Sequence, residues 1–169
     1  MKLFIVGLPG SGKSTLGKQL AARLTLPFLD LDDRIEQHTG EAIRDTFAQR
    51  GEAVFREIER RMLQEIIAEH DQFVLATGGG APCFFDNMDL MNSSGTTLFL
   101  DVPIPTIVQR MQGDQISNRP LLQALDQDQL AQEYTAKFEK RLPVYRQAQV
   151  VVQADTGLDA IERLLKPRS

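Results

Sequence analysis

The chain has 169 residues and a single cysteine, with 42% apolar and 25% charged residues and a formal net charge of −4. This length and composition are typical of one soluble globular domain, and the acidic balance disfavours a broad nucleic-acid or anionic-membrane surface. Because Cys83 has no partner for a disulfide, and no signal peptide or run of 18 apolar residues is evident, we expect a cytoplasmic protein.

The first expected strand, Leu3–Val6, runs directly into the stretch GLPGSGKST, residues 7–15. This stretch fits the pattern G-x-x-x-x-G-K-[ST], the phosphate-binding loop that joins a strand to a helix. Backbone N–H groups at Gly10, Ser11 and Gly12 would cradle phosphates, and the helix that follows adds its positive dipole end. Lys13 would meet the β- and γ-phosphates, Ser14 would ligate Mg²⁺, and Thr15 would lie in the first helical turn. The alternative is a glycine-rich turn that binds nothing.

Short apolar runs then alternate with helical patterns along the chain, which favours parallel βαβ units in an α/β fold. The pattern gives five strands and a single domain over residues 1–169. The expected strands are Leu3–Val6, Phe28–Leu31, Phe73–Ala76, Thr97–Asp101 and Val150–Gln153, and the expected helices are Ser14–Leu24, Asp33–Gln37, Glu41–Gln49, Glu52–Glu69, Pro105–Gln112, Gln127–Arg146 and Leu158–Lys166. In Glu52–Glu69, an apolar stripe at three- and four-residue spacing predicts packing on the sheet.

Two acidic positions are candidate magnesium ligands. In FLDLDD, Asp30 and Asp32 lie at the carboxyl end of the second strand, where ligands gather in open α/β sheets. The alternative is that these carboxylates cap the following helix. Asp101 also ends a strand, but Val102 and Pro103 follow it, which favours a turn residue over a metal ligand.

The segment Gly113–Asp126 interrupts the alternation, since it has no convincing strand and a weak helix signal. Connections of this length inside compact domains are often lids or binding loops, and otherwise mobile surface loops. Its Arg119 makes a mobile lid over the phosphates the more interesting hypothesis.

The ordered set GLPGSGKST, FLDLDDRIE, GEAVFREIE, TGGGAP, NRPLL and KRLPVYR resembles the shikimate kinase family over almost the whole chain. The resemblance implies a P-loop NTPase fold with three α/β/α layers, a five-stranded parallel sheet in the order 2-3-1-4-5 and a mobile lid. It implies transfer of the ATP γ-phosphate to the 3-hydroxyl of shikimate, with Mg²⁺ as cofactor.

The resemblance also implies roles for individual residues. Asp30 corresponds to the carboxylate near Mg²⁺, Asp32 to the acceptor of the substrate hydroxyls, and Lys13 with Arg119 of the lid to the catalytic cations. The expected shikimate-binding residues are Asp32, Arg56, Gly78, Gly79, Gly80 and Arg141, and Arg110 corresponds to a residue that flanks adenine.

Spacing alone gives competing interpretations for two of the arginines. Arg56 lies four residues after Glu52, so it fits an ion pair on a solvated helix face, and Arg141 fits one of several charges on the last long helix. One departure from the family is ADTGLD after the last strand, where some members carry an arginine, so adenine contacts there are expected from the backbone.

Two other functions remain open from the sequence. One is a small-molecule kinase of similar build, such as a gluconate kinase, and the other is a catalytically silent nucleotide-binding protein. For the shikimate kinase interpretation we expect ATP and shikimate as ligands, no nucleic-acid or membrane partner, and a monomer.

Overall fold

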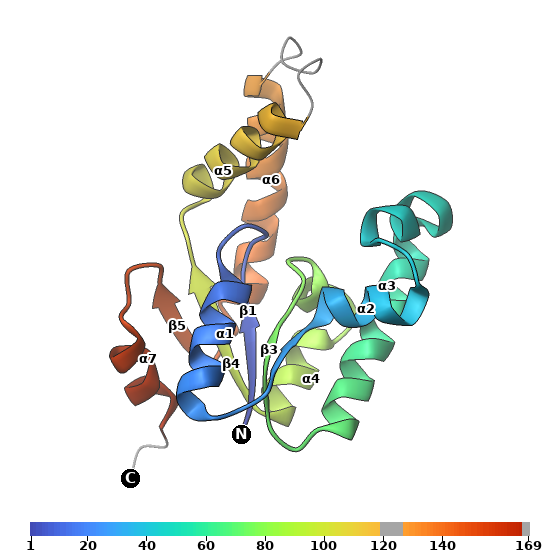
Figure 1. Ribbon diagram of the computed structural model, residues 1–169. Coiled ribbons are helices and arrows are strands. Elements are labelled where there is room, and N and C mark those ends of the chain that lie inside the picture. The colour runs from blue at the N-terminus through green and yellow to red at the C-terminus, as the bar shows by residue number, and fades with distance from the viewer. Residues whose placement is uncertain (119–126, 167–169) are drawn as a thin grey trace.

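The computed structural model describes residues 1–118 and 127–166 (Figure 1). Its elements in chain order are β1 (Lys2–Val6), α1 (Lys13–Leu24), β2 (Phe28–Asp30), α2 (Leu31–Thr39), α3 (Ile43–Glu69), β3 (Phe73–Ala76), the 3₁₀ turn η1 (Ala81–Cys83), α4 (Asn87–Ser94), β4 (Thr96–Asp101), α5 (Ile104–Asn118), α6 (Gln127–Tyr145), β5 (Val150–Gln153) and α7 (Leu158–Leu165).

The five strands form one parallel sheet in the order β2-β3-β1-β4-β5, which confirms the predicted topology. The central strand β1 pairs on both sides, so Leu3 lies opposite Val74 of β3 and Thr96 of β4. Helix α1 connects β1 to β2 at one edge of the sheet, and α4 connects β3 to β4 on the other side of β1. Right-handed crossovers in opposite directions place their helices on opposite faces, which produces the three layers.

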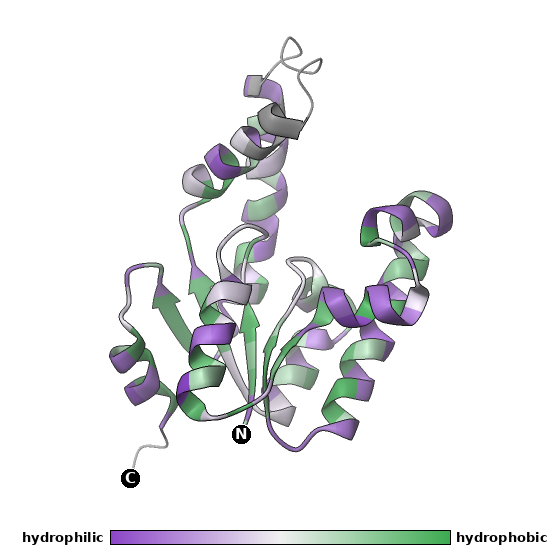
Figure 2. Ribbon diagram, viewed as in Figure 1, coloured by the Kyte–Doolittle hydropathy of each residue, from purple (hydrophilic) through white to green (hydrophobic). Residues whose placement is uncertain are grey.

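The sheet forms the centre of the hydrophobic core. Leu3, Phe4, Ile5 and Val6 of β1 are all fully buried, as expected for a parallel strand that is covered on both faces. Figure 2 shows the strands as hydrophobic and the outer faces of the helices as largely hydrophilic. The apolar stripe on α3 is confirmed, because Phe55, Met62 and Ile66 are buried in the core.

The predicted boundary between the second strand and the following helix was wrong, whereas a predicted break between two helices was right. Leu31 does not end β2 but begins α2, because the Asp30 side chain accepts hydrogen bonds from the backbone N–H groups of Asp32 and Asp33 and so caps a helix that starts earlier. The predicted break between the helices Glu41–Gln49 and Glu52–Glu69 is confirmed, because Gly51 within α3 has non-helical backbone angles (φ 82°, ψ 166°) that separate two helical stretches at a kink.

The expectation that segment Gly113–Asp126 lacks regular secondary structure was wrong in its first part. Residues 113–118 continue α5, which packs against α6, and the two helices project together from the body of the molecule (Figure 1). Tertiary packing here overrides the low helix propensity of Gly113. Residues 119–126, including Arg119, lie outside the described residues. The sequence analysis also missed η1 and α4, which follow the glycines 78–80.

Candidate active site

The loop between β1 and α1 has the geometry of a phosphate cradle. Gly12 adopts φ 97° and ψ 19° immediately before α1, a left-handed conformation that favours glycine and directs backbone N–H groups into the loop. The Ser11 hydroxyl is buried and, among the described residues, is the one buried side-chain polar atom without a hydrogen-bond partner. A buried donor group at the start of a helix suits an anionic ligand.

Lys13 is the first residue of α1, and its side chain folds back over the loop. Its Nζ donates hydrogen bonds to the carbonyl oxygens of Gly7 (2.9 Å) and Leu8 (2.8 Å). Burial lowers the pKa of Lys13 to about 8, although the nearby charges of Asp32 and Asp30 oppose the shift. Lys13 is therefore a desolvated cation at the mouth of the loop, where a phosphate would restore the lost interactions.

The two predicted acidic residues lie opposite the phosphate loop. The Ser14 hydroxyl donates to Oδ2 of Asp30 at 2.8 Å, so these two predicted metal ligands are in contact. Both line an open pocket of about 330 Å³ together with Lys13, Asp32 and Gly79; its other lining residues are Pro9, Gly10, Gly12, Thr15, Thr77 and Gly78. Asp30 is also the cap of α2, so the capping alternative is confirmed without excluding a second role.

Ser14 and Asp30 fit a magnesium ion better than a transition metal. Both offer oxygen ligands, and Mg²⁺ is commonly held by one or two carboxylates with waters and substrate phosphates. Residues 1–118 and 127–166 contain no group of three His, Cys, Asp or Glu side chains that could form a protein-only metal cage.

Asp32 lies in the first turn of α2 and faces the same pocket. Burial raises its pKa from a usual value of 3.8 to about 6; the Asp30 charge adds to the rise and Lys13 opposes it. Its Oδ1 lies only 3.0 Å from the position that a Cβ on Gly78 would occupy. A carboxylate with a raised pKa against a bare backbone is suited to accept a hydrogen bond from a substrate hydroxyl.

The glycines after β3 allow two arginines to approach the backbone. A Cβ on Gly80 would lie 2.5 Å from Nη2 of Arg56, and one on Gly79 would lie 3.2 Å from Nη1 of Arg141. A side chain at Gly80 would displace the Arg56 guanidinium, and one at Gly79 would collide first with Pro9 (2.7 Å) and crowd Arg141. We define residues 78–80 as the glycine loop. The structure therefore brings together the predicted acceptor-site residues from α3, α6 and this loop.

The environment of Arg56 differs from the solvated ion pair that spacing suggested. Its side chain is 9% exposed and pairs with Glu52 (3.3 Å) and also with Glu59 (2.9 Å), a carboxylate that is 1% exposed. The ring of Phe84 lies 4.0 Å from the Arg56 guanidinium carbon, so the plane of the cation is flanked by an aromatic side chain. Burial raises the pKa of Glu59, and the Arg56 charge opposes that rise.

The remaining predicted residues have different outcomes. Arg110 on α5 is exposed, and its Nη1 donates to the Gly10 carbonyl at 2.8 Å, which places it beside the phosphate loop. Thr15 lies in the first turn of α1 and lines the pocket. Asp101 is the last residue of β4 and accepts a hydrogen bond from Gln153 (3.4 Å) of the neighbouring strand.

Sequence reasoning missed several groups that surround the glycine loop. Glu59 lies four residues after Phe55 on the buried stripe of α3, and a charged residue at that position was a usable signal. Asn87 is fully buried; it donates to the Ala81 carbonyl (2.8 Å) and accepts from Arg60 (2.7 Å). No sequence signal identified Asn87, because it belongs to α4, which was itself not predicted.

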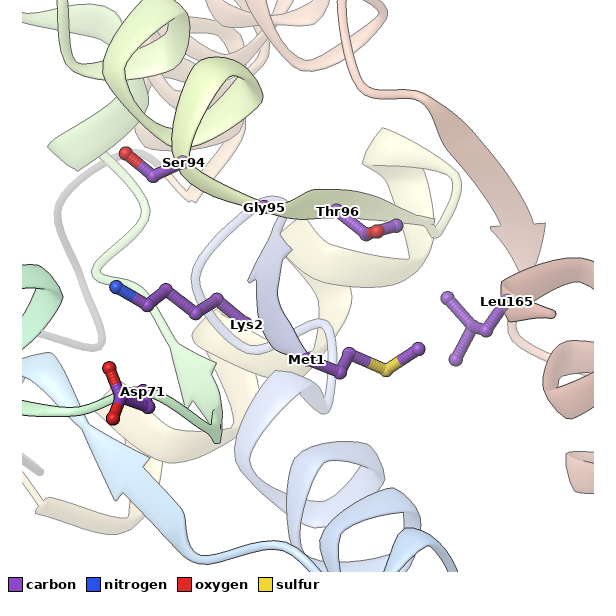
Figure 3. A pocket seen from close by; sticks show the side chains of 7 residues that line it. All are labelled: Met1, Lys2, Asp71, Ser94, Gly95, Thr96 and Leu165. Atoms are coloured by element: carbon purple, nitrogen blue, oxygen red, sulfur yellow. The ribbon is translucent and has the colours of Figure 1, made fainter. Parts of the chain in front are cut away.

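A second open cavity, of about 540 Å³, lies at the opposite end of the sheet. Its lining residues are Met1, Lys2, Asp71, Ser94, Gly95, Thr96 and Leu165 (Figure 3). The Lys2 ammonium donates to the Ile67 carbonyl at 2.6 Å, and the cavity adjoins the amino ends of β1 and β4. Ligands of open parallel sheets bind at the carboxyl ends of the strands, so the pocket beside the phosphate loop is the candidate active site.

In the part of the chain that the structure describes, no helix has both the length and the apolar character needed to cross a membrane.

The comparisons with known proteins point to one family. The family model described as shikimate kinase matches residues 9–166. The shikimate kinase of Bacteroides fragilis is 46% identical over 155 residues, which cover 92% of this chain and 86% of the relative. A crystal structure of shikimate kinase from Bacteroides thetaiotaomicron superposes with a TM-score of 0.81 at 42% identity and covers 98% of this chain and 94% of its own.

Two further structures separate the family from its neighbours. Shikimate kinase from Acinetobacter baumannii, solved in complex with shikimate, has a TM-score of 0.79 at 34% identity and covers 95% of this chain and 87% of its own. A gluconokinase from Sinorhizobium meliloti 1021 is only 16% identical with a TM-score of 0.57, so it shares the fold alone. Sequence and structure together therefore assign the chain to the shikimate kinase family.

Proposed function

We propose that this chain transfers the ATP γ-phosphate to the 3-hydroxyl of shikimate in the pocket between the phosphate loop and the glycine loop. Its family membership makes it an ATP-dependent kinase that acts on a hydroxyl acceptor in the shikimate pathway. The observation that carries the assignment of the site is the convergence of Lys13, Asp32, Arg56 and Arg141 on the same end of the sheet, because two anionic substrates must be held there together.

The acceptor is held through its carboxylate and its hydroxyls. Arg56 and Arg141 present guanidinium groups against Gly80 and Gly79 of the glycine loop, and a planar carboxylate is well matched by such forks. The Phe84 ring and the Glu59 carboxylate restrict the orientation of Arg56, which reduces the entropy lost when shikimate binds. Asp32 accepts a hydrogen bond from the attacking hydroxyl and directs its oxygen toward the phosphate.

The nucleotide is held by the phosphate loop. Backbone N–H groups of Gly10, Ser11 and Gly12 surround the β-phosphate, and Lys13 exchanges its two carbonyl partners for β- and γ-phosphate oxygens. Thr15 adds a contact in the first turn of α1. Arg110 flanks the adenine, a role supported by its contact with the Gly10 carbonyl.

Mg²⁺ is the proposed cofactor, held by Ser14 and Asp30 with the phosphates. When bound, the ion neutralises charge that develops on the transferring group. We assign Arg119 to the same task from the lid side, on the basis of the family motif NRPLL. Phosphoryl transfer needs little covalent chemistry from the protein, so these residues act by positioning and by charge.

The chain is proposed to work as a monomer in the cytoplasm. The one cysteine, Cys83, is free, which agrees with a reducing compartment. Size-exclusion chromatography with light scattering tests the monomer directly.

An ADP-release assay with shikimate, quinate, gluconate and AMP as acceptors, with and without Mg²⁺, tests the proposed function. We expect Mg²⁺-dependent turnover with shikimate far above the other acceptors. Preference for gluconate or AMP would contradict the substrate assignment, and ATP binding without turnover of any acceptor would indicate a silent nucleotide-binding protein.

A further inference from the structure

Tyr145, the last residue of α6, places a buried hydroxyl directly beneath the glycine loop. The side chain is fully buried, and its hydroxyl donates a hydrogen bond to the carbonyl oxygen of Gly79. The ring packs against Phe99 of β4 with the ring centroids 5.3 Å apart, so the core fixes the position of the hydroxyl. Burial raises the pKa of Tyr145 well above its usual range, which keeps the group protonated as a donor.

The same hydroxyl also interacts with Arg141, four residues earlier on α6. Arg141 opposes the pKa rise of Tyr145 through its charge and through a side-chain hydrogen bond. Nη1 of Arg141 is the group that lies 3.2 Å from the Cβ position of Gly79. One buried hydroxyl is therefore shared by a carbonyl of the glycine loop and by a guanidinium of the acceptor site.

The hydrogen bond to Gly79 also orients the next N–H group. The Gly79–Gly80 peptide unit is planar and, like every peptide bond described, trans, so its C=O and N–H point in opposite directions. Holding the Gly79 carbonyl toward Tyr145 fixes the direction of the Gly80 N–H. Without a side chain at either glycine, this hydrogen bond is an important restraint on the peptide plane.

We infer that Tyr145 is a positioning residue for the acceptor, which sets both the glycine-loop peptide and Arg141 without contacting shikimate itself. This inference rests on the proposed function of the site. A tyrosine that only satisfied its own buried hydroxyl would affect stability but would not affect the two substrates differently. Because both partners of the hydroxyl belong to the acceptor side of the pocket, its loss acts on shikimate and not on ATP.

The test is Tyr145→Phe, which removes the hydroxyl and keeps the ring that packs on Phe99. We expect the KM for shikimate to rise about tenfold, as for loss of one or two neutral or charge-assisted hydrogen bonds, with the KM for ATP changed less than twofold. The matched control is Thr97→Val, which removes another fully buried hydroxyl, one that donates to Asn92 and accepts from the Gln149 N–H (3.0 Å) at the amino end of β4. It should lower the melting temperature and leave both KM values unchanged.

The outcomes separate this inference from the proposed function. Wild-type protein that neither binds nor turns over shikimate would overturn both. If the wild type is active, two results would overturn the positioning role alone. One is a shikimate KM that is unchanged in Tyr145→Phe, and the other is an equal rise of the KM values for ATP and shikimate in that variant.

A second measurement covers the case in which Tyr145→Phe does not fold. The chain has only two tyrosines, so ¹³C-labelled tyrosine gives two sets of ring signals, which Tyr134→Phe assigns. The Tyr145 signal of the wild type should shift when shikimate is added. A Tyr145 signal that is unmoved at saturating shikimate would refute the role.

Discussion

The buried pair of Arg56 and Glu59 combines a stability effect and a binding effect that can be separated by mutation. Arg56→Ala leaves the Glu59 carboxylate, which is 1% exposed, without the guanidinium that lies 2.9 Å away. Breaking a buried pair by removing one partner costs about 3–5 kcal/mol, which corresponds to about 6–20 °C in melting temperature for a domain of this size. Loss of a charge-assisted contact to the substrate carboxylate raises the shikimate KM about 10- to 100-fold.

The cost in stability depends on pH in a defined direction. Without Arg56 the pKa of Glu59 rises further, so the native state binds a proton that the unfolded state releases. The stability of Arg56→Ala relative to wild type therefore improves as the pH falls toward 5, because the neutral carboxyl is less costly to bury. Shikimate binding does not recover, since the missing group is the cation.

Urea unfolding and steady-state kinetics on three variants test this reasoning. The double variant Arg56→Met/Glu59→Leu should regain most of the lost stability, because apolar residues can replace a buried pair, and should still bind shikimate weakly. Arg61→Ala is the matched control on the same helix, since Arg61 is 67% exposed and pairs with Glu65 at 3.0 Å. Its loss should cost less than about 1 kcal/mol and leave kinetics unchanged. Wild-type shikimate KM in Arg56→Ala, or recovered shikimate binding in the double variant, would refute the reasoning.

Three further predictions concern the pocket. Gly80→Ala should raise the shikimate KM at least about tenfold with ATP binding intact, because the added Cβ meets Arg56 at 2.5 Å, whereas Gly157→Ala, with open space around its Cβ, should be silent. Asp30→Asn should raise the Mg²⁺ requirement, and Asp32→Asn should lower kcat and shikimate affinity while ATP binding survives; wild-type kinetics in both would reduce these carboxylates to a structural role. Since Asp32 has a pKa of about 6 in the native state and a usual value of 3.8, the metal-free native state binds the extra proton and its stability rises as the pH falls through 6. The difference in unfolding free energy between Asp32→Asn and wild type should accordingly change by about 1.4 kcal/mol in favour of wild type between pH 7.5 and pH 5, and a pH-independent difference in urea unfolding would contradict the shift.

Much of the fold was accessible from the sequence because its signals are local. Strands β3 and β5 have the predicted ends, since each is a short run dominated by apolar or β-branched residues with a polar residue directly before it. The end of β2 was misjudged because the Asp30 side chain can serve either an extended strand or a helix cap, and only the capping hydrogen bonds decide between them. The helix α4 was missed because NMDLMNSS has a weak helical pattern and gains its stability from packing on β4.

The site was accessible mainly through the phosphate loop and the family resemblance. Spacing correctly paired Arg56 with Glu52 but assigned the pair to a solvated face, because i, i+4 spacing does not state which side of a helix is buried. Tyr145 acts through a contact with Gly79, 66 residues earlier in the chain, and Glu59, which pairs with Arg56 within α3, lies 3.3 Å from the position that a Cβ on Gly78 would occupy. Contacts of this kind depend on how α3 and α6 meet at the glycine loop, and no local pattern encodes that arrangement.

The central claim is that this pocket transfers phosphate from ATP to one hydroxyl of shikimate. Phosphorus and proton NMR of the product formed from ATP, Mg²⁺ and shikimate tests it most directly, because the spectra identify the phosphorylated carbon and the stoichiometry together. We predict one equivalent of shikimate 3-phosphate for each ADP formed with the wild type, and none with Lys13→Ala. ADP that accumulates without phosphorylated shikimate, or phosphate attached to another hydroxyl, would contradict the account.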